Sequence, residues 1–273
     1  MNELALAADI ALAAALEASE AVMRVYTTAF GVQYKGKDDP VTLADHEANA
    51  LLCERLSRKF PGVPIVAEES DPSTYAGFEA ADTAWFVDPL DGTREFVARN
   101  GEFAVMIGLA RGGRAALGVI VAPTWGRSFV GIVGHGAWAV EKDGSRAPIH
   151  VSTRPSPEGA SILVSRSHTP PRLASLVAAV HAGETMIHGS SGLKAVLVAT
   201  GAYDVYLQPG HAGMRWDACA SEALVNAAGG NCTDADGVAF EYAGSELANR
   251  RGLVATNGLL HESIIAAVRA AYR

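Results

Sequence analysis

The chain has 273 residues, of which 49% are hydrophobic, and it carries a formal net charge of −8. This length allows one large domain or two closely packed ones, and the apolar content is enough for a substantial core. The acidic balance, without a dense Lys/Arg stripe, argues against a nucleic-acid-coating protein, although bound divalent cations would still admit an anionic substrate.

Residues 3–27 are predicted to form an amphipathic helix, because Glu17, Glu20 and Arg24 recur at helical spacing. Acidic Glu3 and Asp9 stand where a signal peptide would be basic. No later run of about 18 uncharged apolar residues offers a membrane span. We therefore expect a soluble protein without stable membrane insertion.

The three cysteines are too few and too scattered for a disulfide framework or a zinc knuckle. They favour a reducing, cytoplasmic compartment.

Residues 35–40 are predicted to be a polar loop, and a helix is predicted from Thr42 to about Phe60. Thr42 and Asp45 have the spacing of an N-cap and its acidic partner three residues later. Capping alone and a functional role for Asp45 are equally compatible with this pattern.

Two short apolar runs end in acid. Residues 64–67 lead into Glu68 and Glu69, and residues 84–87 lead into Asp88. Each run is predicted to be a buried strand, and strand ends are where α/β sheets place ligands. Glu68 and Glu69 taken alone are typical of surface charge, and Glu69 is expected to be an outer or surface carboxylate.

The segment Asp88-Pro89-Leu90-Asp91-Gly92-Thr93 is predicted to be a rigid turn, since proline fixes its own φ and glycine adopts angles closed to other residues. Two carboxylates facing one small volume need protons or cations, and hard oxygen ligands suit Mg²⁺. The alternative is an Asp-Gly turn with a capping Asp.

Residues 71–82 are expected to be a polar surface loop, and residues 103–140 an antiparallel meander of apolar segments separated by short turns. Residues 143–159 contain three prolines and are predicted to be a junction. The junction divides an N-terminal α+β half, 1–150, from a C-terminal α/β half, 151–273.

The second half alternates strands and helices, which implies an α/β layer. Strands are predicted at 161–164, 185–188, 202–207 and 253–256, and helices at 172–180, 190–200, 216–228 and 259–272.

Two helix starts in this half carry chemistry. Ser190 and Ser191, within Gly189-Ser190-Ser191-Gly192, together with Lys194 would make an anion site, the alternative being a capped helix with a surface lysine. Asp217 either caps its helix or completes a metal cluster.

The chain resembles the inositol monophosphatase superfamily over nearly its whole length. The resemblance rests on three motifs in this order: Glu68 in Ala-Glu-Glu-Ser, the segment from Asp88 to Thr93, and Asp217 in Trp-Asp-Ala-Cys-Ala. The stretches 91–96, 99–103 and 165–168 look most like its bacterial 3'(2'),5'-bisphosphate nucleotidases of the CysQ type. The resemblance implies an αβαβα sandwich and Mg²⁺-dependent hydrolysis of adenosine 3',5'-bisphosphate to AMP and phosphate.

The resemblance also implies roles for single residues. Two or three Mg²⁺ ions would be held by Glu68, Asp88, the Leu90 carbonyl, Asp91 and Asp217. Asp45 and Thr93 would orient the attacking water. Substrate contacts would come from Gly92, Thr93, Ser167, His168, Ser190, Ser191 and Lys194. Lithium sensitivity, a role in sulfur assimilation and a possible homodimer are further implications.

One position departs from the nucleotidase pattern. Gln208 stands where these enzymes usually carry an arginine, and a neutral amide does not replace a bidentate phosphate contact. Arg215 is a candidate replacement. The alternatives are an inositol-1-phosphate, histidinol-phosphate or sugar-bisphosphate phosphatase, or a non-catalytic binding protein, against which the intact acid set argues.

Overall fold

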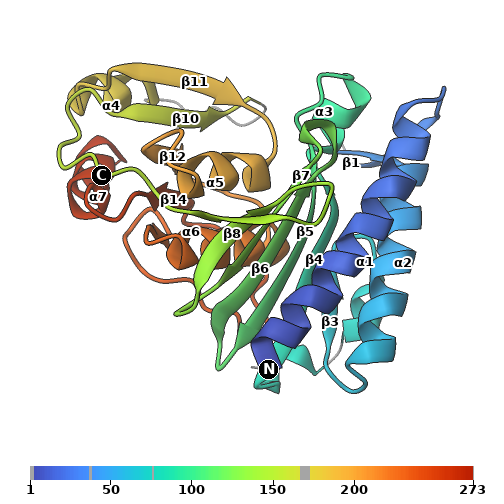
Figure 1. Ribbon diagram of the computed structural model, residues 1–273. Helices are drawn as coiled ribbons and strands as arrows, with labels where there is room; N and C mark the ends of the chain where they lie inside the picture. The colour runs from blue at the N-terminus through green and yellow to red at the C-terminus, as the bar shows by residue number, and fades with distance from the viewer. Residues whose placement is uncertain (1–2, 37–38, 76, 167–172, 273) are drawn as a thin grey trace.

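The computed structural model describes residues 3–36, 39–75, 77–166 and 173–272. They form five layers in the order helices, sheet, helices, sheet, helices, which Figure 1 shows from right to left. The predicted αβαβα sandwich is therefore confirmed.

The first sheet has seven strands in the order β3-β4-β5-β6-β7-β8-β9. Adjacent strands are antiparallel, except for β3 and β4, which are parallel. The strands are β3 (Ile65–Ala67), β4 (Thr83–Asp91), β5 (Ala104–Arg111), β6 (Arg114–Ala122), β7 (Arg127–Ile132), β8 (Gly136–Val140) and β9 (Arg146–Ile149). The predicted meander is confirmed. Strand β9, an exposed edge strand without apolar alternation, lies within the segment predicted as a junction and was not predicted.

Helices α1 (Glu3–Tyr26) and α2 (Leu43–Lys59), which were both predicted, cover the outer face of this sheet. Ala8, Ala11, Ala15 and Ala18 lie at helical spacing on α1 and are buried. Their small side chains let α1 lie close to the sheet and to α2.

The second sheet has the order β11-β10-β12-β14-β13, with β10 parallel to β11 and β12. Its strands are β10 (Ser161–Ser165), β11 (Glu184–His188), β12 (Val205–Gln208), β13 (Asn231–Thr233) and β14 (Leu253–Thr256). Helices α4 (Leu173–Ala179) and α7 (His261–Tyr272) pack on its outer face. All of these strands and helices were predicted except β13, which has three residues and is too short to show an alternation of apolar and polar side chains.

Two segments predicted as loops contain regular secondary structure in their described residues. Strands β1 (Val32–Gly36) and β2 (Asp39–Thr42) form a hairpin where residues 35–40 were expected to be a polar loop. Residues 71–82 contain short 3-10 helices at Pro72–Tyr75 and Phe78–Ala80, and Tyr75 and Phe78 are buried. These aromatic side chains fix the segment to the sheet, because the Phe78 ring lies 6.3 Å from that of Phe86.

Helices α5 (Ser191–Ala199) and α6 (Arg215–Ala227) fill the layer between the sheets (Figure 1). Gly108, Gly118 and Gly131 pair across β5, β6 and β7 and form a glycine row beneath α6. A Cβ atom at these positions would lie only 2.6 Å from Cys219 Cβ, 2.3 Å from Ala220 O and 2.7 Å from Leu224 Cα, respectively. The row therefore brings α6 into backbone contact with the sheet.

The same layer buries a carboxyl group, that of Glu222. Glu222 on α6 is 4% exposed and accepts a hydrogen bond of 2.7 Å from Tyr242 Oη. Burial raises the pKa of Glu222 to about 7, although the Tyr242 hydrogen bond and Arg114 act in the opposite direction.

We expect Glu222→Gln to become increasingly stabilising as pH rises. A carboxyl group whose pKa is higher in the folded state contributes stability that is complete below its unfolded pKa and is lost as pH rises through the folded value near 7. Between pH 5 and 9 the advantage of the Gln variant in unfolding free energy should grow by roughly 3 kcal/mol. Urea unfolding of both proteins at pH 5, 7 and 9 measures this difference, and parallel pH profiles would contradict it.

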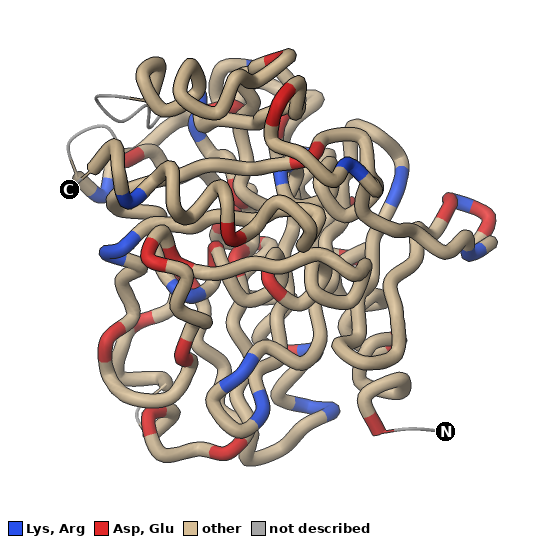
Figure 2. The backbone as a smooth tube through the Cα atoms, turned by 90° about the vertical axis from the view of Figure 1, so that its left-hand side faces the viewer, with Lys and Arg blue, Asp and Glu red and all other residues tan. Residues whose placement is uncertain are grey.

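Acidic and basic residues are interleaved along the described backbone in Figure 2. Among the helices of the described ranges, none combines the length and apolar character needed to cross a bilayer.

Candidate active site

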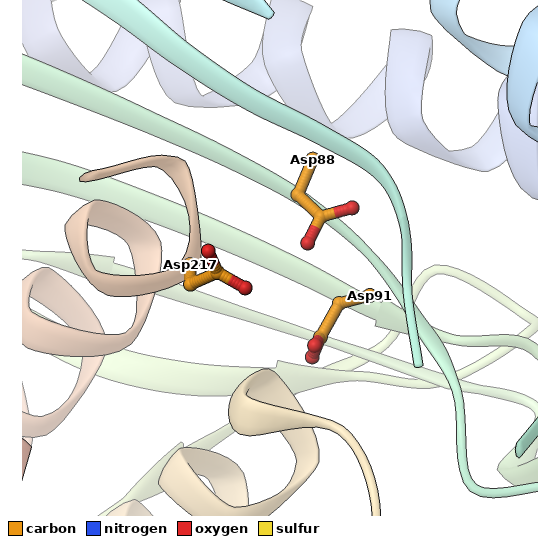
Figure 3. A group of neighbouring side chains, drawn as sticks. All are labelled: Asp88, Asp91 and Asp217. Carbon is orange, nitrogen blue, oxygen red and sulfur yellow. The ribbon is translucent and has the colours of Figure 1, made fainter. Parts of the chain in front are cut away.

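Three aspartates from two distant parts of the chain meet at one point. Asp88 and Asp91 extend from β4 and Asp217 from the first turn of α6, and Figure 3 shows their carboxyl groups facing one another. One oxygen atom from each lies within 4.8 Å of the others. Glu68, at the end of the neighbouring strand β3, adds a fourth acid that interacts with Asp88.

The backbone around these aspartates differs from the predicted rigid turn. Strand β4 continues through Pro89 to Asp91, and its pairing with β5 shifts register between Asp88 and Asp91. Such a bulge inserts residues into one strand, which here lets both carboxylates face the same side. Gly92 then turns the chain at φ 96° into the short helix α3 (Thr93–Val97), and a Cβ there would lie 2.7 Å from Glu102 O.

Burial and mutual repulsion make the acids difficult to ionise together. Burial, followed by the charges of Glu68, Asp91 and Asp217, raises the pKa of Asp88 well above its usual range. Burial with neighbouring charges does the same for the pKa of Asp217, and raises that of Glu68 to about 7. Three carboxyl groups in this state attract either protons or cations.

The donor set fits a hard divalent cation. It consists of carboxylate oxygens with the Leu90 carbonyl beside them, and all of these residues line one cleft of about 540 Å³. Mg²⁺ and Mn²⁺ prefer such oxygen ligands, whereas Cys219, the nearest thiol on α6, is buried in the core against Gly108.

Lys35 from the β1–β2 hairpin partly offsets this negative charge. Its Nζ lies 3.1 Å from Glu68 Oε1 and 2.6 Å from Glu69 Oε1. The pKa of Lys35 is raised by the two glutamates against the opposing effect of burial. The Glu69 side chain is 4% exposed, which excludes the surface position and leaves the outer position of the two that were expected.

Asp45 and Thr93 form a connected pair beside the acids. Thr93 Oγ1 lies 2.9 Å from Asp45 Oδ1 and 3.1 Å from the Leu90 carbonyl, and its single proton serves one of them at a time. Asp45 Oδ2 accepts hydrogen bonds from the backbone N and the hydroxyl of Thr42, 2.7 Å each. Burial raises the pKa of Asp45, although these hydrogen bonds act to lower it.

Asp45 and Asp217 both cap their helices, and these caps are compatible with the functional alternatives left open by the sequence. Asp45 caps α2 with one oxygen and contacts Thr93 with the other. Asp217 Oδ2 accepts a hydrogen bond of 2.7 Å from Met214 N, which caps α6, while its carboxyl group belongs to the acid cluster. Capping and clustering are compatible because a carboxylate has two oxygens with several acceptor sites.

The N-terminus of α5 binds a carboxylate, but the carboxylate belongs to the protein. Asp91 accepts hydrogen bonds from Ser190 Oγ, from Ser191 N at 3.1 Å and from Gly192 N at 2.7 Å. The positive end of the helix dipole favours the negative charge placed there. The donors predicted to be free for a ligand are thus engaged by Asp91, and the substrate contacts of Ser190 and Ser191 stay predictions.

Lys194 is neither at the surface nor remote from the cleft. It is 2% exposed, and its Nζ donates to Ser190 O at 2.6 Å and to His188 O at 3.3 Å. Burial lowers the pKa of Lys194 to about 8. It also lies 4.9 Å from the Tyr206 ring centroid, so it holds the turn before α5 and lines the cleft at once.

The cleft brings together most of the residues predicted from the sequence. Those lining it are Glu68, Asp88, Leu90, Asp91, Gly92, Thr93, Ser190, Ser191, Lys194 and Asp217. Asp45 reaches it through Thr93. Ser167 and His168 lie outside the described residues.

Two uncertain positions are now placed. Gln208 lines the cleft, whereas Arg215 donates from Nη1 to Gly244 O at 2.9 Å and is not among the described residues that line it. The Arg215 guanidinium is thus engaged at Gly244, and its role as a replacement for a phosphate-binding arginine stays a prediction. Lys35 was missed by sequence reasoning, because it lies 33 residues from Glu68 and no local pattern links them.

Comparison with known proteins places these features in a family. The model of the "Inositol monophosphatase family" matches residues 3–273. A Salmonella typhimurium protein described as "3'(2'),5'-bisphosphate nucleotidase CysQ" is 37% identical over 230 residues, covering 84% of this chain and 90% of its own. An Aggregatibacter actinomycetemcomitans protein of the same description is 33% identical over 216 residues, or 79% and 80% of the two chains.

Solved structures agree with this relationship. An inositol monophosphatase from Anabaena superposes with a TM-score of 0.80 at 28% identity, covering 99% of this chain and 98% of that one. The CysQ protein from Bacteroides thetaiotaomicron gives a TM-score of 0.77 at 28% identity, with 94% and 98% covered.

Proposed function

The chain belongs to the inositol monophosphatase family, and on that basis we propose that it is a 3'(2'),5'-bisphosphate nucleotidase that hydrolyses adenosine 3',5'-bisphosphate to AMP and phosphate. The observation that carries the proposal is the acid cluster of Asp88, Asp91 and Asp217 in a cleft that also contains Thr93 bonded to Asp45. The relatives named as CysQ nucleotidases support this substrate class.

The family is one of metal-dependent phosphatases, and we assign Mg²⁺ to this site. The ions would be held by Glu68, Asp88, the Leu90 carbonyl, Asp91 and Asp217. When bound, divalent cations lower the pKa of water and offset charge on a phosphoryl group, which removes the need for a protein nucleophile.

The chain's own residues would handle the proton. Thr93 Oγ accepts the proton of the attacking water while it passes its own to Asp45 Oδ1, 2.9 Å away. The raised pKa of buried Asp45 suits a group that must accept a proton. Thr42 holds the other oxygen of Asp45, so the carboxylate stays oriented toward Thr93.

Substrate contacts are part of the same proposal. Gly92 and Thr93 lie at the start of α3, where backbone N–H groups can meet phosphoryl oxygens. Ser190, Ser191 and Lys194 line the same cleft and would face the nucleotide and its second phosphate, together with Ser167 and His168. The proposed setting is the reducing cytoplasm, in keeping with three free cysteines.

The first test is phosphate release from adenosine 3',5'-bisphosphate, inositol 1-phosphate and fructose 1,6-bisphosphate, with Mg²⁺ and with chelator. We expect turnover of the nucleotide to exceed that of the other two and to stop with chelator. Preference for inositol 1-phosphate would overturn the substrate and keep the reaction type. Absence of turnover on all three with Mg²⁺ would overturn the enzyme assignment.

A further inference from the structure

Glu102, in the loop before β5, joins two segments that are distant in sequence. Its Oε2 accepts hydrogen bonds from Gly189 N at 2.7 Å and from Arg166 Nε at 2.9 Å. Its Oε1 accepts a further hydrogen bond from Arg166 Nη2 at 2.7 Å. The carboxylate is thus held by a bidentate guanidinium on one side and a backbone amide on the other, a geometry of high directional specificity.

Gly189 begins the turn that binds Asp91. The next three residues, Ser190 to Gly192, supply the hydroxyl and the two amides that hold both Asp91 oxygens. Ser191 Oγ also lies 3.2 Å from the Asp217 carbonyl. Glu102 is therefore separated from two members of the acid cluster only by this one turn.

The turn is held in a conformation that it would not adopt alone. Ser190 has φ 54°, a left-handed value that is unfavourable for a residue with a side chain. A Cβ at Gly189 would lie 2.3 Å from Glu95 Cγ and 3.0 Å from Glu102 Oε2, so only glycine fits against these carboxylates. External contacts must stabilise such a turn, and the Glu102 carboxylate is one of them.

Arg166 connects the same carboxylate to the end of β10. It follows β10, hydrogen-bonds to Ile187 O at 3.3 Å, and directly precedes Ser167 and His168 in the chain. The side chain of Glu102 is 19% exposed, which keeps its pair with Arg166 partly shielded from water.

We propose that Glu102 is a positioning residue that fixes the 189–192 turn on Asp91 through Gly189 N–H and ties this turn to the end of β10 through Arg166. The inference rests on the proposed function, in which Asp91 holds a metal ion. Residues that orient metal ligands typically change metal affinity or activity by about 10–100-fold when removed.

The experiment compares Glu102→Ala and Glu102→Gln with the wild-type chain, using Mn²⁺ binding by calorimetry without substrate, and then kcat and KM. The Ala variant removes both contacts, and we expect its Mn²⁺ affinity and its kcat each to fall about 10-fold or more. The Gln variant keeps an oxygen that can accept from Gly189 N–H, so its Mn²⁺ affinity should recover to within about threefold of wild type. Loss of the charge pair with Arg166 should leave its KM raised.

Glu141→Gln is the matched control, because Glu141, directly after β8, also accepts a hydrogen bond from an arginine, Arg127 Nε on β7, at 2.8 Å, and neither residue lines the cleft. It should leave Mn²⁺ affinity, kcat and KM unchanged. Wild-type Mn²⁺ affinity in Glu102→Ala overturns the proposal, and so does a Gln variant as impaired as the Ala variant.

Circular dichroism checks that Glu102→Ala is folded. If it is not folded, Arg166→Met replaces it in the experiment, because this variant leaves the hydrogen bond from Gly189 N to Glu102 in place. A raised KM with unchanged Mn²⁺ affinity supports the proposal. An unchanged KM overturns it. Because Mn²⁺ binding is measured without substrate, a wild-type chain inactive on the nucleotide defeats the proposed function while the Glu102 comparison still decides this inference.

Discussion

Asp88→Asn is expected to abolish turnover while it stabilises the metal-free protein. The amide keeps the shape of the side chain and can still accept the 3.0 Å hydrogen bond from Leu90 N, but it removes a negative charge at the centre of the cluster. Losing one charged ligand should cost several kcal/mol of transition-state stabilisation, which is about 10³-fold or more in kcat. Relief of a buried, crowded charge should raise the unfolding free energy in chelator by about 1–3 kcal/mol at pH 8.

The sign of the stability change follows from the pKa of Asp88. Because this pKa is raised in the folded state, protonation of Asp88 favours the folded state of the metal-free protein over the unfolded state. The metal-free protein therefore loses stability as pH rises through the folded-state pKa. The advantage of Asn should therefore vanish at low pH and grow with increasing pH. Thermal unfolding with and without Mg²⁺ measures it, and Mg²⁺ should raise Tm in the wild type far more than in the variant.

Asp143→Asn is a suitable control for this experiment, because Asp143 is an exposed turn residue that accepts from Ser145 N. It should change neither turnover nor the response of Tm to Mg²⁺. If Asp88→Asn kept more than a tenth of wild-type turnover, Asp88 would not be a metal ligand.

Thr93→Val should lower kcat by about 10²–10⁴-fold, the usual contribution of a positioned proton acceptor, and leave KM and metal affinity close to wild type. Valine matches threonine in shape and removes only the hydroxyl that contacts Asp45. Thr42 still holds the other oxygen of Asp45, so the fold should be retained.

Thr93→Ser serves as the matched variant, since it keeps the hydroxyl and should retain kcat within a few-fold. The measurement is kcat, KM and the Mg²⁺ concentration for half-maximal rate for all three proteins. A normal kcat in Thr93→Val would contradict the proton relay. A normal kcat at saturating Mg²⁺ with a higher Mg²⁺ requirement would instead assign Thr93 to the Leu90 carbonyl, its other neighbour at 3.1 Å.

Local sequence patterns were sufficient for most of the fold. The spacing of Thr42 and Asp45 predicted the start of α2, and apolar runs ending in acid predicted where β3 and β4 deliver Glu68 and Asp88. These features depend on residues within a few positions of each other. The failures, at β1, β2, β9 and β13, are short strands with little apolar alternation, and their pairing is decided by the neighbouring strand.

The interior of the site was less predictable, because its geometry arises from contacts across long sequence separations. Ser191 and Gly192, at the start of α5, lie 100 and 101 residues from Asp91, and no local sequence pattern indicates that they bind it. Lys35 on Glu68 and Glu102 on Gly189 are similar cases. An N-terminus of a helix predicts an anion, but it does not say whether the anion is a ligand or a carboxylate of the same chain.

The glycine row beneath α6 extends the constraints on catalysis well beyond the cleft. Gly131 contacts α6 at Leu224, seven residues and about 10 Å along the helix axis from Asp217. A methyl group at any of these three glycines would push α6 away from the sheet, and Asp217 would move away from Asp88 and Asp91. These three glycines carry no catalytic group, yet a side chain at any of them would displace α6. The position of Asp217 therefore depends on the absence of side chains in the middle of the sheet.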